Sequence, residues 1–182
     1  ILDGEKGFFR IDGYETIDFP FMVKELGDRW WIRDASYKRW PLCRHGNHAL
    51  TGFDNLVNKH KFKAEEIERV FVKGRAVSFF TQDEQKITPE LNIPYCMSML
   101  MFDVMPGPRW YSQLNNLDEP RMKEFRAKVT GEPDDATVKI LQQANNGPTP
   151  ARPTKTPTTV EITARGKTFS ERVEYAKGDP WT

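Results

Sequence analysis

The sequence is poor in the side chains that build metal centres and disulfide frameworks. It has only two cysteines, Cys43 and Cys96, and three histidines among its 182 residues. One disulfide could form between these distant cysteines, but a disulfide-stapled scaffold is excluded. Two thiols also fall short of the usual ligand set of an iron–sulfur cluster. We therefore expect a reducing, cytoplasmic compartment.

The chain also lacks an excess of charge of either sign and any long apolar run. Its 27 basic and 26 acidic residues give a net charge of +1, so electrostatics provide no reason to expect a nucleic-acid partner or an anionic membrane. No apolar run approaches the roughly 18 residues of a membrane span, and no stretch is ordered like a signal peptide. We expect a soluble protein. Its start at Ile1, without a methionine, is compatible with a processed product, a separate subunit or a fragment.

The hydrophobic spacing predicts an α+β fold, with helices packed on a small mixed or antiparallel sheet. Leu50, Phe53, Leu56 and Val57 recur every three or four residues, which predicts an amphipathic helix over 47–58. The other predicted elements are a short helix before Gly27, a strand over 69–73 that 75–81 continues or pairs with, a buried helix from Pro94 to Val104, a helix within 117–129 with Asp118 as a possible cap, and a hairpin over 160–175 that turns at Arg165-Gly166.

We interpret residues 1–182 as a single domain. Within it, residues 142–159 are rich in proline, threonine and asparagine, which predicts a loop or mobile linker. Trp30, Trp31 and Trp40 lie close together in sequence and are expected to anchor a core or an interface.

The segment "YKRWPLCRHGNHALTGFDNL", residues 37–56, gathers the residues that suit chemistry. Arg44, His45 and His48 lie at or just before the expected helix N-terminus, where free N–H groups favour an anion. Arg44 can bind a carboxylate through two hydrogen bonds, and a histidine can donate or move a proton near neutral pH. Lys38, nine residues before the expected helix, can serve as an acid, a base or a plain cation. The pattern therefore indicates a carboxylate-binding site.

Other interpretations of the same residues stay open. Arginine and histidine near a helix start are common surface groups without a function. His45 and His48 are spaced as metal ligands, but no third ligand is evident, so we predict no metal site. Cys43 beside Arg44 has a feature of a reactive thiol but no local base.

Four stretches together resemble the C-terminal domain of the MmgE/PrpD family. "YKRWPLCRHGNHALTGFDNLVNKHKFKAEEIERVFV" is similar to a family segment with a lysine, a Cys-Arg-His motif, a helix and "EDIERVEV". "LDGEKGFFR" resembles the segment that leads into this domain, "NIPYCMSMLMFD" resembles "FSIPYALALALLDG", and "FSERVEYAKGDP" resembles the closing "V-x-YPKGDPENP". The stretches occur in the family's order from about residue 2 to residue 180.

The resemblance implies a function in carboxylate metabolism. The family includes 2-methylcitrate dehydratase, cis-aconitate decarboxylase and iminodisuccinate epimerase, which act on small di- and tricarboxylates without a metal or organic cofactor. Its members combine a large helical domain with a smaller α+β lid, and this chain resembles only the lid. The resemblance thus implies a lyase, most plausibly a dehydratase, that needs a helical domain and forms an oligomer. A non-catalytic carboxylate- or partner-binding module derived from the lid is the alternative.

The resemblance also assigns roles to individual residues. By position, Lys38 and Tyr95 match the lysine and tyrosine that the lid contributes to the active site, and Arg44 and His45 match its Cys-Arg-His motif. We expect Lys38, Tyr95 and His45 to be catalytic and Arg44 and His48 to bind substrate, with His48 the weaker assignment. The helical domain would supply the main base.

Overall fold

The structure, a computed structural model, describes residues 7–13, 16–75, 79–80, 88, 91–112, 119–145 and 155–181. The chain divides into two compact units, residues 1–35 and 36–182. The first unit contains the short helices α1 (Phe8–Ile11) and α2 (Phe19–Val23) and the 3₁₀ turn η1 (Trp31–Asp34). α2 ends at Val23 and not at Gly27 as predicted, because only turns follow it through residue 28. Trp30 is 69% exposed and packs into no core, whereas Trp40 of the second unit is buried.

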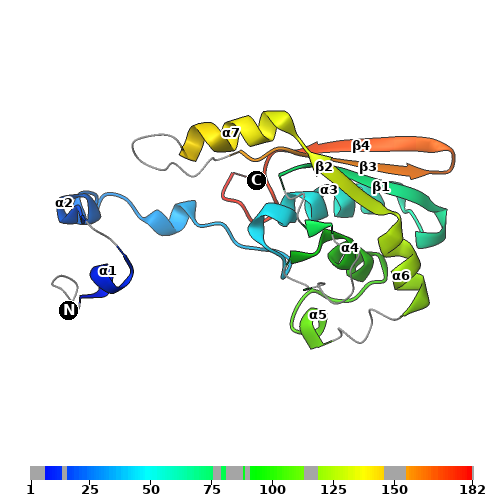
Figure 1. Cartoon of the computed structure of the whole chain (residues 1–182), viewed down its shortest axis with the longest axis horizontal. Helices are drawn as coiled ribbons and strands as arrows, with labels where there is room; N and C mark the ends of the chain where they lie inside the picture. The colour runs from blue at the N-terminus through cyan, green and yellow to red at the C-terminus, as the bar shows by residue number, and fades with distance from the viewer. Residues whose placement is uncertain are drawn as a thin grey trace. The chain divides into compact units, whose positions relative to one another are not determined.

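The second unit is built on one four-stranded sheet within the described residues. Its strands are β1 (Ile67–Gly74), β2 (Val129–Pro133), β3 (Thr158–Ala164) and β4 (Lys167–Val173), in the order β2-β1-β3-β4. β1 pairs in parallel with β2 and antiparallel with β3, and β3 pairs antiparallel with β4. The predicted α+β fold with a small mixed sheet is therefore confirmed (Figure 1).

The predicted hairpin is confirmed in detail. β3 and β4 are joined by Arg165 and Gly166, whose φ angles are 54° and 68°. Two successive residues of positive φ form the type I′ turn whose twist matches a two-residue hairpin. The predicted strand over 69–73 also lies within β1. Of the predicted continuation over 75–81, residues 76–78 and 81 lie outside the described residues, and residues 75, 79 and 80 are not in a strand.

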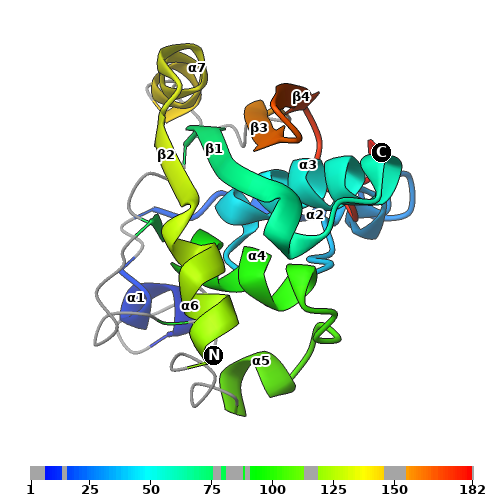
Figure 2. The ribbon, with the colours of Figure 1, turned by 90° about the vertical axis from the view of Figure 1, so that its right-hand side faces the viewer.

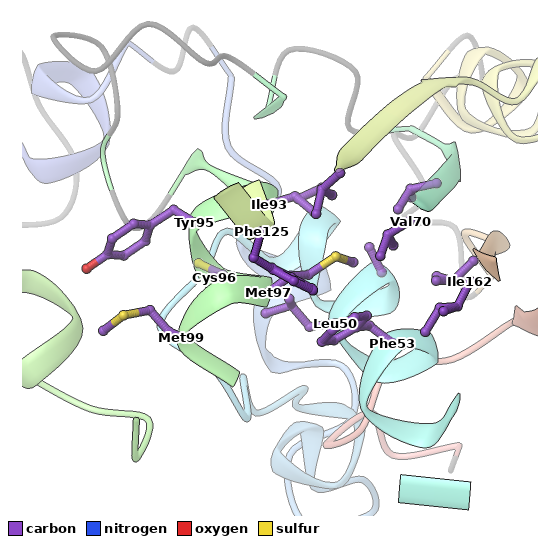
Figure 3. Packing of buried hydrophobic residues seen from close by; sticks show 14 of the residues in the cluster. Leu50, Phe53, Val70, Ile93, Tyr95, Cys96, Met97, Met99, Phe125 and Ile162 are labelled. Atoms are coloured by element: carbon purple, nitrogen blue, oxygen red, sulfur yellow. The ribbon is translucent and has the colours of Figure 1, made fainter. Parts of the chain in front are cut away.

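Three helices cover one face of this sheet: α3 (Arg44–His60), α4 (Ile93–Met101) and α6 (Pro120–Ala127) (Figure 2). α3 packs directly on β3 and β4, while α4 packs against α3 and α6. Buried side chains of both layers form the core, for example Phe53 on α3, Met97 on α4 and Ile162 on β3 (Figure 3). Each such side chain contributes about 1.5–3 kcal/mol by leaving water.

The close approach of α3 to the sheet depends on a glycine. A Cβ at Gly52 would lie 2.8 Å from Cγ2 of Val160 and 3.2 Å from Cγ2 of Val173. Both valines are buried, on β3 and β4. α3 also begins three residues earlier than predicted, at Arg44. It ends at His60, and the next residue, Lys61, caps it in the left-handed conformation. Arg44, His45 and His48 of the proposed site therefore belong to the helix itself.

Other element boundaries differ from the prediction. α4 ends at Met101 and not at Val104, because Asp103 turns to a φ of 56° and the Val104 N–H bonds back to the Met99 carbonyl. Glu119 caps α6 by accepting from the Met122 N–H at 2.8 Å, whereas Asp118, the expected cap, lies outside the described residues.

The predicted loop over 142–159 is wrong at both ends. α7 (Asp135–Asn145) extends into its start, and β3 begins at Thr158. Residues 146–154, its centre, lie outside the described residues. The carboxylate of Asp134 accepts from the Thr137 N–H at 3.1 Å and caps α7. An aspartate is a common N-cap residue, so the sequence does contain a signal for the start of this helix. The remaining short helix α5 (Arg109–Ser112) and the 3₁₀ turn η2 (Ala64–Glu66) complete the unit.

Candidate functional site

Helix α3 begins at a polar cluster where the two ends of the 36–182 unit meet. Arg44, its first residue, donates from Nη2 to Oδ1 of Asp179 at 2.6 Å and to Oγ of Ser36 at 3.0 Å. The backbone N–H of Tyr37 donates to the Gly178 carbonyl at 2.8 Å. Arg44 therefore joins the first and last segments of this unit through one nitrogen of its guanidinium.

The carboxylate of Asp179 is the buried centre of the cluster. Its side chain is 3% exposed, compared with 33% for Arg44, and Oδ2 accepts from the Ala176 N–H at 3.0 Å. A buried carboxylate persists only when it is paired and hydrogen-bonded, so Asp179 fixes where the guanidinium of Arg44 lies. Sequence reasoning did not count Asp179 among the site residues, although it belongs to the closing Gly-Asp-Pro stretch.

A glycine conformation brings Asp179 to this position. Gly178 has a φ of 94°, and a Cβ there would lie 2.0 Å from the Tyr37 carbonyl oxygen. Only glycine fits a left-handed backbone that lies this close to another backbone segment. The Lys-Gly-Asp order is thus a local signal for a tight turn that presents an acid.

His48 lies in the interior, one turn further along α3. Its side chain is 1% exposed, and Nε2 lies 3.0 Å from Oγ1 of Thr156 and 3.9 Å from Oδ2 of Asp179. Burial lowers the pKa of His48 to about 4, with a smaller opposing effect from Asp179 and a smaller lowering effect from Arg44. Nδ1 makes no hydrogen bond of normal geometry, although the Arg44 carbonyl nearby favours its protonation slightly. The structure therefore places the predicted substrate-binding residue His48 as a neutral group beneath the surface.

His45 faces a different neighbour from His48. It is half-buried, and its Nδ1 lies 3.3 Å from Nη1 of Arg75, the residue that follows β1. Burial lowers the pKa of His45, and the charges of Arg75 and Arg44 lower it further. Arg75 is the second residue that the sequence reasoning missed, because nothing local to β1 shows that its end lies beside the start of α3.

Lys38 and Cys43 flank the cluster without joining it. Lys38 is exposed and makes no hydrogen bond or ion pair with any described residue. Cys43 is a half-buried free thiol that precedes α3, and its carbonyl accepts from the Gly46 N–H at 2.9 Å. Cys96 is buried on α4 and is not bonded to Cys43, so the disulfide left open by the sequence is not formed.

Tyr95 belongs to the buried side of α4. Its phenol points away from Met97 and the sheet (Figure 3), and its hydroxyl donates to the Trp110 carbonyl of α5 at 2.7 Å. Burial raises the pKa of Tyr95 to about 12. The neighbouring Tyr111 hydroxyl donates to the Pro41 carbonyl at 3.1 Å. Two successive residues of α5 therefore have different partners: Trp110 accepts from Tyr95, and Tyr111 donates to Pro41, in the segment after Lys38. Lys38 and Tyr95 do not contact each other directly.

The described residues contain no group of three histidine, cysteine or acidic side chains close enough to hold a metal ion. His45 and His48 face Arg75 and Thr156 respectively, so the two imidazoles do not converge on one ion. Within the same ranges, no helix combines the length and apolarity that crossing a bilayer requires. What the cluster offers is cations, imidazole and backbone N–H groups, which suit an anion.

Comparison with known proteins identifies the relatives of this domain. The family described as MmgE/PrpD C-terminal domain matches residues 40–182, which include Arg44, His45, His48, Tyr95 and Asp179. The match leaves out Lys38 and the leading segment that also resembles the family. No curated protein matches the chain. Since the match covers most of the sequence and the fold agrees with it, the chain belongs to the MmgE/PrpD family as a C-terminal domain.

Proposed function

We propose that this domain is the lid of a cofactor-independent lyase that acts on small di- or tricarboxylates. Dehydration of a 2-methylcitrate-like hydroxy acid is the reaction we favour, and decarboxylation or epimerisation would use the same substrate class. The helical domain of the family, on the same polypeptide or another one, would complete the site. The observation that carries this proposal is the gathering of basic groups at the start of α3.

The charges at this end of α3 favour an anion. Arg44 and Arg75 carry two positive charges that both act on His45, and of these two only Arg44 has an acidic partner among the described residues, the buried Asp179. The free N–H groups of the first turn of α3 add partial positive charge. Since Asp179 and Ser36 both bond Nη2 of Arg44, whose side chain is one-third exposed, the other nitrogens of its guanidinium would bind a substrate carboxylate.

The roles then follow from what each side chain can donate. Arg44 and the helix N-terminus would hold one carboxylate of the substrate. Dehydration removes a proton from the carbon beside a carboxylate, and negative charge develops on that carboxylate. Lys38 would stabilise this charge or deliver a proton to the leaving hydroxyl, with His45 as a second proton donor. The helical domain would supply the base.

Tyr95 can take the role of acid only after a local rearrangement. Its hydroxyl is occupied by the Trp110 carbonyl and its pKa is raised, so α5 would have to move before the phenol met a substrate. The same observation supports the alternative function, a carboxylate- or partner-binding module that has lost catalysis. In that case Tyr95 is only a core residue.

Native mass spectrometry of the protein purified from its own source, followed by a turnover screen of di- and tricarboxylates, tests the proposal. We expect a helical MmgE/PrpD domain in the complex or in the same polypeptide, and formation of a conjugated alkene from a hydroxy acid, seen by ultraviolet absorbance. A complex that contains the helical domain but turns over no carboxylate would favour the binding module instead.

A further inference from the structure

Arg75 lies at the surface beside His45, close to the start of α3. It directly follows the last residue of β1, its side chain is exposed, and its Nη1 lies 3.3 Å from Nδ1 of His45. A guanidinium carries donors only, so Nδ1 of His45 must be the acceptor of this contact. The proton of the neutral imidazole then resides on Nε2, which makes no hydrogen bond to the described residues.

The arrangement leaves a positive charge unbalanced. Some other exposed arginines of this domain have partners of another kind: Arg165 donates to both carboxylate oxygens of Glu66, Arg121 donates to Glu119, and Arg69 lies over the ring of Phe71. Arg75 instead contacts an imidazole, and no acid of the described residues pairs with it. Its charge and that of Arg44 both oppose protonation of His45. A positive charge without a counter-ion, such as that of Arg75, is stabilised by a bound anion.

We propose that Arg75 binds a second carboxylate of the substrate and holds His45 as the tautomer that donates from Nε2. This inference rests on the proposed function and specifies its substrate: a molecule with at least two carboxylates, one bound by Arg44 and the α3 N-terminus and the other by Arg75. A monocarboxylate would use only the first of these groups. Arg75 is thus a residue that selects di- and tricarboxylates.

Nitrogen NMR of the full chain labelled at histidine provides two readouts. The first is binding, followed through the His45 resonances during titration with tricarballylate, glutarate or butyrate. We expect Arg75→Gln to weaken tricarballylate and glutarate about tenfold, which corresponds to loss of one charge-assisted contact, and to change butyrate less than twofold. The second is the tautomer, since loss of the guanidinium donor should lower the fraction of His45 that is protonated on Nε2.

Arg69→Gln is the matched control. Arg69 is an exposed arginine within β1, it lies over the ring of Phe71, and its replacement removes the same charge. It should leave all three titrations and the tautomer unchanged.

Three outcomes separate the two proposals. A tenfold loss specific to Arg75→Gln supports both. Equal binding by both variants, with tricarballylate still bound at His45, overturns the role of Arg75 alone. If none of the three carboxylates shifts His45 in the unmodified chain, the carboxylate site itself is refuted, and the role of Arg75 is refuted with it.

Discussion

At the scale of single residues, the start of α3 separates two histidines that the sequence presents as a pair. His45 faces Arg75 at the surface, whereas His48 is enclosed between Thr156 and Asp179. The two histidines therefore differ in exposure, since His45 is half-buried and the side chain of His48 is 1% exposed. A spacing of three residues on a helix could not distinguish these environments, because both neighbours arrive from distant parts of the sequence.

The burial of His48 predicts a pH dependence of stability. Its pKa is about 4 in the folded protein and 6.5 when unfolded, so the unfolded chain takes up a proton that the folded one does not. The free energy of unfolding should fall by roughly 3 kcal/mol as the pH drops from 6.5 to 4, and His48→Gln should remove this part of the slope. Denaturant titration across this range measures it. Asn58→Gln, on the exposed side of α3, should keep the original slope, and an unchanged slope in His48→Gln would contradict the assignment.

Tyr95→Phe tests whether the buried phenol is structural. Removing its hydroxyl leaves the Trp110 carbonyl unpaired, which should lower the free energy of unfolding by about 1–2 kcal/mol. Tyr111→Phe is the control, since its hydroxyl also donates to a carbonyl but is exposed, and should cost less than about 0.5 kcal/mol. We expect the assembled Tyr95→Phe enzyme to keep its turnover. A hundredfold loss of turnover would instead restore Tyr95 to the catalytic role that the family resemblance implies.

At the scale of elements, the sequence predicted those with strong local patterns. Three elements follow from local patterns: α3 from its apolar spacing, α4 from the proline near its start, and the hairpin from its Arg-Gly turn. β2 was missed because "VTGEP" has a glycine, a proline and one buried side chain, and it is a strand only through its parallel pairing with β1. α7 was missed although Asp134 supplies an ordinary cap, since the proline-rich stretch after it dominated the interpretation.

The contact of α3 with the sheet predicts the effect of filling the space at Gly52. Alanine favours a helix by about 1 kcal/mol over glycine, but the new methyl group would lie 2.8 Å from Cγ2 of Val160. Overpacking of this kind costs about 1–3 kcal/mol, so Gly52→Ala should be destabilising on balance in a thermal or denaturant measurement. In the Gly52→Ala/Val160→Ala double variant, the total loss in the free energy of unfolding should be smaller than the sum of the losses in the two single variants. Fully additive losses would show that the two residues do not press on each other.

At the scale of the whole molecule, the sequence located the site region but not its organisation. The basic residues of 37–48 and their position beside a helix start were predicted from local spacing. Asp179, which orients Arg44 from 135 positions away, and Arg75, at the end of another element, required the fold. Both residues contact the start of α3 from positions far away in the sequence, and a single sequence carries no local pattern for such contacts.

Lys38→Ala is the sharpest test of the proposal that this domain supplies Lys38 to a carboxylate lyase. Lys38 is exposed and unpaired among the described residues, so its loss should leave stability unchanged. The measurement is turnover of the assembled enzyme, lid with helical domain, on a 2-methylcitrate-like hydroxy acid. We predict a loss of about 10²–10⁴-fold for Lys38→Ala and none for Lys59→Ala at the far end of α3. Turnover of Lys38→Ala equal to that of the unmodified enzyme would contradict the account.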